Sequence, residues 1–458
     1  MVRNLFLVLV CFYLGADYEV ASAKNPAKIN SNKIVDRSEN NAAQMEGITF
    51  EESVVAAYNN NPAWFGSQTE NKVAEEYYKQ SKLMFLPSVE ASVSTSRKKQ
   101  KYDEISDDEK ATSTEVGISL TQNLFNGFST VNTMRASNNS SKAALYKLKF
   151  DEQDLIIKVL EAYMSVWAGR QKVVALKKKE ENLKNTLNSQ KSSLEFGVGT
   201  PSEVAFAGAN YQKAVYERIN AETELSAAKA EFERLTGLTA DRELGLPRLS
   251  IELPKNLNDL IVVALGCNNS ILHYRFAEQA AFDELNVARG RLSPSCDLRL
   301  EADRNLPKGG SSKTHGRNTY SASLQVRIPI FSNSPSSGNS YSAIAIANQK
   351  ALKAEFSAQN AVLEIKKECI VNWNVYISAN AMIQSSRSAV KSAELSSAGN
   401  LEESSLGLKS NTEVWDKENR LLESRIDLVN SKKQKIIAGF KLFALTGKLN
   451  LYSVLKKK

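Results

Sequence analysis

The distribution of proline is the feature that most constrains the fold of this chain. The sequence holds ten prolines, and none of them lies within residues 88–200, 202–246 or 336–458. Proline breaks a helix interior, because it removes a hydrogen-bond donor and its ring clashes with the preceding turn. Proline-free stretches of this length, rich in Ala, Glu, Lys, Leu and Ser, are typical of very long helices. A compact enzyme built from short elements does not have this pattern.

Side chains suited to catalysis or metal binding are scarce. The 458 residues include two histidines and four cysteines, and Cys267, Cys296 and Cys369 follow no CxxC spacing. Zinc sites and histidine-based catalytic triads need more of these side chains than the chain supplies. We therefore expect no enzymatic activity, no bound metal and no cofactor.

Residues 1–23 have the pattern of a secretory signal peptide. Arg3 precedes an apolar run from Leu5 to Leu14, and an A-x-A cleavage site follows at 21–23. A short membrane anchor is the less favoured alternative, because about ten apolar residues cannot cross a hydrocarbon layer of ~30 Å as a helix. Residues 24–47 are rich in Asn, Lys and Ser and are expected to form a flexible segment.

Two later segments alternate apolar and polar residues with the period of a β-strand. In the first, residues 87–124, two alternating runs flank a charged stretch from Arg97 to Lys110. The second, residues 294–330, has the same pattern around a Gly/Ser/Lys loop. Each segment predicts a β-hairpin with one apolar and one polar face, as in a half-buried sheet or a barrel wall.

A long helical hairpin is predicted after each β-hairpin, over residues 128–237 and 336–447. The helix from 128 to 196 would be about 100 Å long at 1.5 Å per residue. Gly197 and Gly407 interrupt the two hairpins and predict their tip turns. Both hairpins end in Leu-Thr-Gly, where glycine suits a helix C-cap.

These matches indicate an internal duplication. Gly197 and Gly407 are 210 residues apart, as are the two Leu-Thr-Gly ends, and Trp167 and Trp373 are 206 apart. Landmarks at a near-constant offset predict two structural repeats, at 48–247 and 248–449, followed by a basic C-terminal tail at 450–458.

Four strands cannot close a barrel, and an open sheet edge cannot face lipid with its backbone groups unpaired. Three chains would supply twelve strands, which can close. The long helices would then extend away from the barrel as a tube across the periplasm, so the pattern predicts a trimer in the outer membrane.

The residues that carry these features resemble the TolC family of outer-membrane channel-tunnels. The similar segments are Leu120–Gly127, Val326–Phe331, Phe196–Val204 and the two Leu-Thr-Gly ends. The resemblance implies an α+β membrane protein of long helical hairpins forming a trimeric periplasmic α-barrel, with four strands per chain in a 12-stranded outer-membrane β-barrel. It also implies a homotrimer embedded in outer-membrane lipid, with a large periplasmic portion.

The implied partners are a periplasmic adaptor protein and an inner-membrane transporter of the ABC or RND class. The implied activity is passive conduction of drugs or of secreted proteins from that transporter out of the cell. The sequence does not decide between the two cargoes.

The resemblance also assigns residues at the periplasmic mouth. The acidic ring of the family maps on Glu413 and Asp416, which share one helix face at a spacing of i and i+3. Six such carboxylates in a trimer would attract cations at a narrow constriction. An ordinary solvated helical pair is the alternative interpretation.

Polar links between tip turns hold the family's mouth closed. Their positions are Lys409, where the family has an arginine, facing Ser202, and Glu203, where the family has an aspartate. A family tyrosine is replaced by Ser404, and lysine cannot reproduce the two-pronged contact of arginine. We expect a mouth held more loosely or by different pairs.

Two other classes of protein stay open at this point. A periplasmic adaptor would need lipoyl-like β modules and a single hairpin, and a structural coiled-coil envelope protein would need sustained heptads. The net charge of +8 does not indicate nucleic-acid binding, because the basic residues are spread among acids. The run Lys177–Lys179 is interpreted as part of a solvated helix face.

Overall fold

The structure is a computed structural model that describes residues 47–100, 109–247, 254, 256–308, 316–330 and 341–455. Its helices and strands, from α3 onward, belong to one compact unit, Thr49–Lys458. The predicted signal peptide at 1–23 and nearly all of the segment at 24–47 lie outside the described residues.

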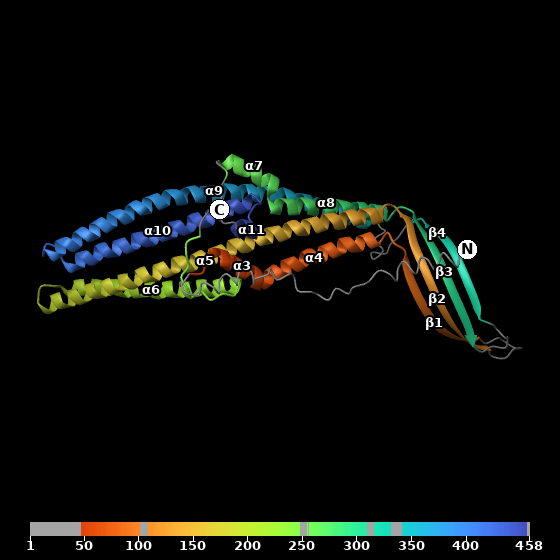
Figure 1. Cartoon of the computed structure of the whole chain (residues 1–458), viewed down its shortest axis with the longest axis horizontal. Coiled ribbons are helices and arrows are strands. Elements are labelled where there is room, and N and C mark those ends of the chain that lie inside the picture. Colours follow the sequence, from red (N-terminus) through yellow and green to blue (C-terminus); the bar gives the residue numbers. More distant parts are fainter. Residues whose placement is uncertain are drawn as a thin grey trace, which may run out of the picture. The chain divides into compact units, whose positions relative to one another are not determined.

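One order of elements occurs twice along the chain: two helices, two strands and two long helices (Figure 1). The first half contains α3 (Phe50–Asn60), α4 (Pro62–Leu83), β1 (Ser88–Gln100), β2 (Glu109–Asn126), α5 (Ser129–Glu195) and α6 (Pro201–Thr236). The second half contains α7 (Leu257–Cys267), α8 (Asn269–Gly290), β3 (Ser295–Lys308), β4 (Arg317–Arg327), α9 (Tyr341–Ser405) and α10 (Asn411–Leu445), and α11 (Leu451–Leu455) follows.

Asparagine caps join the short helices to the long ones in the same way in both halves. Asn61 caps α4, and its side-chain Nδ2 donates to the carbonyl of Leu235 at the end of α6, at 3.2 Å. Asn268 caps α8, and its Nδ2 donates to the carbonyl of Leu445 at the end of α10, at 3.1 Å. Each cap therefore satisfies backbone groups at two helix ends, which would otherwise lack intrahelical partners.

The four strands form one antiparallel sheet in the order β1-β2-β3-β4. Its central pair joins β2 to β3, so the two halves of the chain meet in the middle of the sheet. The register places apolar side chains in cross-strand rows, for example Val89, Leu120, Leu300 and Ala322. The neighbouring row on the opposite face is polar: Glu90, Ser119, Glu301 and Ser321. Successive residues of a strand point to opposite faces, which explains the two-sided sheet.

Both strands of the first hairpin extend further than the alternating pattern predicts. β1 continues to Gln100 and β2 begins at Glu109, so parts of the charged stretch from Arg97 to Lys110 are strand rather than loop. The expected loop is shorter because Arg97–Gln100 continue the ladder opposite Glu109–Thr112. Backbone pairing needs no apolar side chain, so charged residues can lie in a strand.

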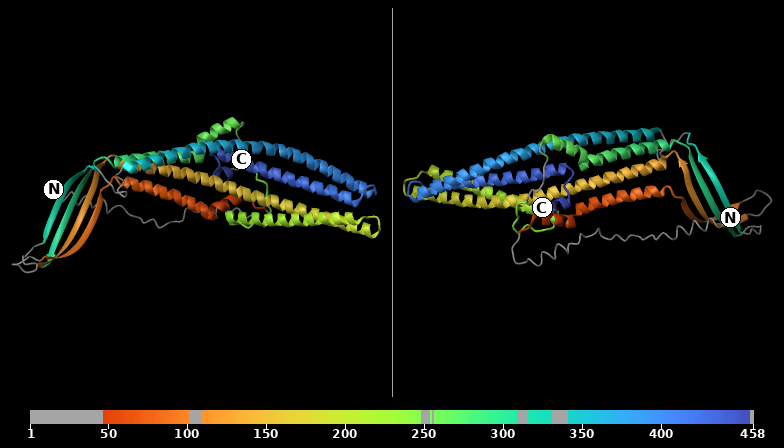
Figure 2. Two further views of the ribbon diagram at one scale, coloured as in Figure 1. Left: turned by 180° about the vertical axis from the view of Figure 1, so that it is seen from behind. Right: turned by 45° about the horizontal axis from the view of Figure 1, so that its top comes forward.

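The helices of this unit lie side by side, and the sheet lies at one end of them (Figures 1 and 2). Helix α5 has 67 residues, about 100 Å at 1.5 Å per residue, and packs against α4, α6, α8 and α10. The core lies midway along the helices, where Tyr163 of α5 packs edge-on against Phe50 and close to Phe232. A second cluster in the other half gathers Leu260, Ile271, Ile365 and Leu442.

The chain passes between sheet and helices at a close backbone contact. A Cβ atom on Gly127 would lie 2.3 Å from the carbonyl oxygen of Gly290, so no larger residue fits there.

Within the segment predicted as a basic tail, Leu451–Leu455 form α11, and the Leu451 backbone N–H donates to Glu152 of α5 at 3.0 Å. None of the described helices has an apolar stretch long enough to cross a membrane.

Candidate functional site

The tips of the two long hairpins share one backbone conformation. Gly197 and Gly407 have φ values of 77° and 74°, a left-handed conformation that favours glycine. One residue further on, the N–H of Val198 donates to Ser193 and that of Leu408 to Glu403, at 3.0 and 2.9 Å. This is the six-to-one bond of a Schellman motif, which closes a helix end on a glycine. The glycine breaks therefore produce two equivalent turns, as the sequence predicts.

A groove of about 520 Å³ lies between the two hairpins next to these turns. Helices α5, α6, α9 and α10 all contribute to it. Four of the residues predicted for the mouth line it together: Glu203, Lys409, Glu413 and Asp416. Ser202 is not among the lining residues and is exposed at the start of α6. The structure thus brings the predicted acids and the lysine into one groove, but not the serine.

The two predicted ring acids lie in the first two turns of α10, and each forms an ion pair with a basic side chain four residues away in sequence. Lys409 Nζ lies 3.3 Å from Glu413 Oε2, and Arg420 Nε lies 3.3 Å from Asp416 Oδ2. All four side chains keep between 42% and 67% of their surface exposed. Pairs of this kind at i and i+4 stabilise a helix only weakly, so the carboxylates stay available to ions in the groove.

Glu203 occupies the position in the first repeat that Glu413 occupies in the second. Its carboxylate accepts from the Thr200 backbone N–H at 2.8 Å, and the Thr200 hydroxyl accepts from the Glu203 N–H at 3.2 Å. This reciprocal capping box satisfies two backbone donors at the start of α6. The Glu203 carboxylate is therefore engaged by its own helix end.

Within the single chain, Lys409 and Ser404 contact residues of their own tip turn. Lys409 forms an ion pair with Glu413 of its own segment. Ser404, at the position of the family tyrosine, contacts Asn411 of its own turn, with 3.4 Å between Oγ and Oδ1. Sequence position alone could not distinguish a partner four residues away from one across the groove.

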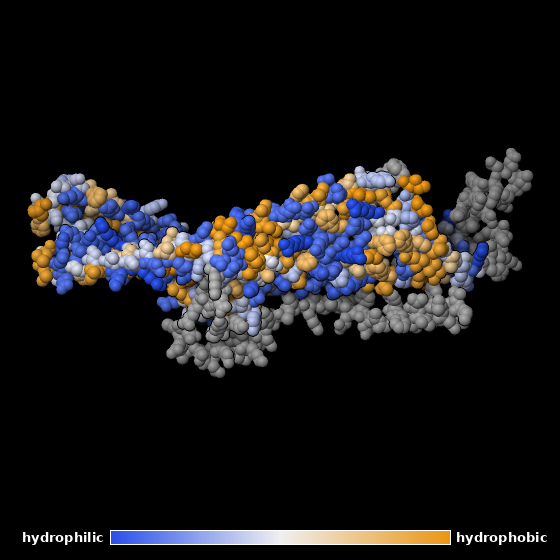
Figure 3. Space-filling model, turned by 90° about the horizontal axis from the view of Figure 1, so that it is seen from above, coloured by the Kyte–Doolittle hydropathy of each residue, from blue (hydrophilic) through white to orange (hydrophobic). Residues whose placement is uncertain are grey.

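Both tip turns also present apolar side chains to solvent. Phe196 and Val198 are each 82% exposed, and Leu406 and Leu408 are 70% and 71% exposed. Figure 3 shows the corresponding hydrophobic surface at the far ends of the two hairpins. These side chains belong to the two turns next to the groove and are largely exposed in the single chain.

The sequence did not reveal a polar junction that lies beside the groove. Lys179 of α5 contacts Glu217 of α6 and Glu423 of α10, with Nζ to carboxylate distances of 3.2 and 2.8 Å. Only 17% of its side chain is exposed, so Lys179 does not belong to a solvated face as the lysine run suggests. Burial lowers the pKa of its ammonium group, but hydrogen bonds and charges from Glu423 and Glu217 outweigh burial and leave the pKa above its ordinary value.

One helical turn along α5, Asn182 makes a second contact with α10. Its Nδ2 donates to Glu418 Oε2 at 2.9 Å and to Asn419 Oδ1 at 3.3 Å. The side chains of Asn182 and Asn419 are both buried. These partners are more than 230 positions apart in sequence, and each looks like an ordinary polar helix residue.

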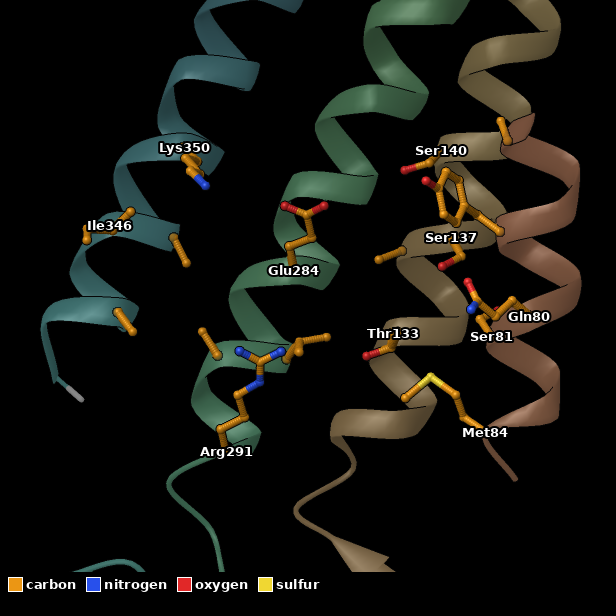
Figure 4. A pocket seen from close by; sticks show the side chains of 17 residues that line it. Gln80, Ser81, Met84, Thr133, Ser137, Ser140, Glu284, Arg291, Ile346 and Lys350 are labelled. Atoms are coloured by element: carbon orange, nitrogen blue, oxygen red, sulfur yellow. The ribbon is translucent and has the colours of Figure 1, made fainter. Parts of the chain in front are cut away.

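Near the sheet, α4, α5, α8 and α9 stand side by side and line a second, open cavity of about 930 Å³ (Figure 4). Most of its lining is small or hydroxylated, as with Thr133, Ser137 and Ser140 of α5. Charged groups come from Glu284 and Arg291 of α8 and from Lys350 of α9. Small side chains leave this face of the helical wall hollow.

A family model described as outer membrane efflux protein matches the chain twice, over residues 54–238 and 260–448. Together the matches cover well over half of the 458 residues. Among the described residues, β1 and β4 each have one partner strand, and the long helices form two hairpins. The chain belongs to the outer membrane efflux protein family.

Individual relatives agree with this assignment. The chain is 26% identical to the outer membrane efflux protein BepC of Brucella suis over 408 residues, which span 89% of this chain and 87% of that protein. It is 23% identical to the outer membrane protein TolC of Escherichia coli, over 74% of this chain and 70% of that protein. The fold is similar to a crystal structure of a membrane protein from Pseudomonas aeruginosa, with a TM-score of 0.74, 16% identity and coverage of 89% of this chain and 92% of that one.

These findings confirm the predicted family, fold class and outer-membrane localisation. Family members are channels rather than enzymes. The division of the chain into signal peptide, flexible segment, two repeats and tail stays a prediction, as do the roles of the mouth residues.

Proposed function

We propose that three copies of this chain form an outer-membrane channel-tunnel that passively conducts drugs or secreted proteins. In this arrangement the strands cross the outer membrane and the long helices form a tube through the periplasm. The chain itself carries out no catalysis and needs no cofactor, since its task is to enclose a path.

The two-faced sheet with open edges is the observation that carries this proposal. β1 and β4 each have one partner strand within the described residues, so each leaves an edge for another chain. On the apolar face, Val93, Tyr320 and Leu324 are 73%, 78% and 63% exposed in the single chain. An exposed apolar face is favourable in contact with lipid. In lipid, however, every strand edge must be paired, so the sheet has to close into a barrel. Twelve strands from three chains meet both demands.

The groove at the tips supports a constriction at the periplasmic end. Glu413 and Asp416 of each chain would contribute six carboxylates, which favour cations over anions in a narrow pore. Glu203 is held in its own capping box, and Lys409 and Arg420 partly offset the ring charge. We propose that Glu413 and Asp416 set the cation sensitivity of the channel.

The partners are a periplasmic adaptor protein and an inner-membrane ABC or RND transporter. The exposed apolar side chains of the tip turns, including Phe196 and Leu408, support docking of a partner at this end. The proposal leaves either cargo class to be identified by experiment.

Three measurements test the assembly and the function. Chemical cross-linking of the protein extracted from outer membranes should give trimers, and the purified trimer should form conducting channels in planar lipid bilayers. Deletion of the gene should increase sensitivity to a panel of drugs or remove specific proteins from the culture medium. A monomer without channel activity would contradict the proposal.

A further inference from the structure

The polar junction between α5 and α10 has a geometry suited to fixing the constriction. Lys179 and Asn182 are three residues apart on α5, so they lie on one helix face. On α10, Asn182 contacts Glu418 and Asn419 and Lys179 contacts Glu423. Asn419 and Glu423 are four residues apart and likewise share a face. The contacts therefore form two successive rungs between α5 and α10, which we call the clasp.

The clasp is close to the two ring acids. Asn419 lies three residues after Asp416 and itself lines the groove that contains Glu413 and Asp416. Glu423 follows Asp416 by seven residues, which is about 10 Å along the helix. A helix of this length is stiff over two turns, so fixing Asn419 and Glu423 also fixes the direction in which the start of α10 points.

Burial makes these contacts stronger than the exposed ion pairs at the start of α10. The Asn182 side chain is 1% exposed, and without its partners on α10 the amide would be buried and unsatisfied. Lys179 is 17% exposed and bridges two carboxylates from different helices. Surface pairs such as Lys409 with Glu413 contribute far less, because water screens them.

We propose that Lys179 and Asn182 act as positioning residues, which hold the start of α10 on α5 and thereby place Glu413 and Asp416 at the constriction. This inference rests on the proposed function, since it concerns how the channel's acidic ring is held. It adds a role for residues that touch neither the ring acids nor a passing ion.

Block of single-channel current by a trivalent cation in planar bilayers is the readout for this role. Glu423→Gln removes the carboxylate charge that Lys179 contacts on α10. Asn182→Leu removes the amide that contacts α10 and keeps a side chain of similar size. Each should raise the blocking cation concentration at least three-fold and broaden the distribution of conductance levels, because the ring acids are no longer held at fixed positions.

Two variants serve as matched controls. Glu217→Gln removes the carboxylate charge that Lys179 contacts on α6 and leaves its contact with Glu423 on α10 intact. Lys441→Gln breaks another α5–α10 ion pair, to Glu161 at 2.7 Å, but this pair lies about 38 Å from Asp416 along α10. Both control channels should be blocked at the same cation concentration as the unmodified channel.

The outcomes separate the clasp from the proposed function. Unchanged block in both Glu423→Gln and Asn182→Leu would overturn the clasp, as would an equal change in Lys441→Gln. If the unmodified trimer shows no cation block, or if block survives replacement of Glu413 and Asp416, the constriction itself is wrong. Trimer yield in the membrane is measured for every variant, and the exposed Glu423 keeps the test decisive if Asn182→Leu does not assemble.

Discussion

The two tip turns have the same backbone and different charges. Gly197 and Gly407 share a conformation, and a glutamate follows each by six residues. In the first turn, the Glu203 carboxylate accepts a hydrogen bond within the Thr200 capping box. In the second, the Ser410 hydroxyl accepts from the Glu413 N–H at 3.3 Å, while the Glu413 side chain pairs with Lys409. One backbone motif therefore supports a closed cap in one repeat and a chemically available carboxylate in the other.

Neighbouring positions extend the contrast. Phe206 occupies in the first repeat the place of Asp416 in the second, and Gly199 the place of Lys409. Charge is thus concentrated on the second turn, and apolar surface and backbone caps on the first. In the proposed channel, the second repeat would therefore supply the ion-sensitive ring and the first repeat its support.

The largest expected effect separates the two glutamates. Replacing Glu413 and Asp416 together by alanine should weaken cation block at least ten-fold, because six carboxylates leave the constriction of the trimer. Glu203→Gln should leave block unchanged, since glutamine preserves a capping box and the removed charge does not belong to the ring. Blocking titrations on both channels provide the measurement, and equal effects would break the contrast between the turns.

The next largest effect is expected from replacing the tip glycines. Alanine at Gly197 or Gly407 should cost about 1–2 kcal/mol of local stability, the penalty of a left-handed conformation with a Cβ atom. The two costs should be equal, because an added Cβ would have no neighbour within 4 Å at either position. Hydrogen exchange of the amides near each turn measures them. A clearly larger cost at one glycine would contradict the equivalence of the backbones.

A smaller effect is expected from the cations beside the ring. Lys409→Gln and Arg420→Gln should each lower the blocking cation concentration about two-fold, because a helical ion pair is worth about 0.3–0.5 kcal/mol. Lys177→Gln, which removes an exposed pair to Glu222 on α6, is the matched control. Weaker block in Lys409→Gln would instead assign this lysine to the link between turns that the family resemblance predicts.

The smallest effect concerns alkaline pH. The pKa of Lys179 is raised, so its stabilising contribution is complete below the ordinary lysine pKa of about 10.4 and is lost only as pH rises through the higher value in the folded protein. Glu217 and Glu423 are the charges that face it. Cation block should therefore stay constant from pH 7 to pH 9.5. A decline already at pH 9 would show that the ammonium group is not held as described.

Local patterns in the sequence predicted the backbone well. Missing prolines indicated the long helices, and the glycines at 197 and 407 indicated the turns. The strand ends were predicted less well, because the charged residues after Arg97 pair through their backbones.

The side-chain contacts of the site could not be predicted in the same way. The residues of the clasp are hundreds of positions apart, and nothing local distinguishes Lys179 from the exposed Lys177 and Lys178 beside it. The partner of Lys409 depends on a choice between two acids in one groove, Glu203 and Glu413. Such contacts follow from how the hairpins pack, which the period of a helix does not specify.

The order of strands in the sheet has a consequence for biosynthesis. β1 and β2 are neighbours in the chain, but β2 also pairs with β3, as in Asn126 opposite Ser295. We expect the first hairpin to be able to form before the second half is available, which leaves the β2 edge open in the meantime. Exposed edges recruit other strands, so the half-made protein needs protection from aggregation during export. Because distant contacts form late, we expect the joining of the two halves to be a slow step of folding.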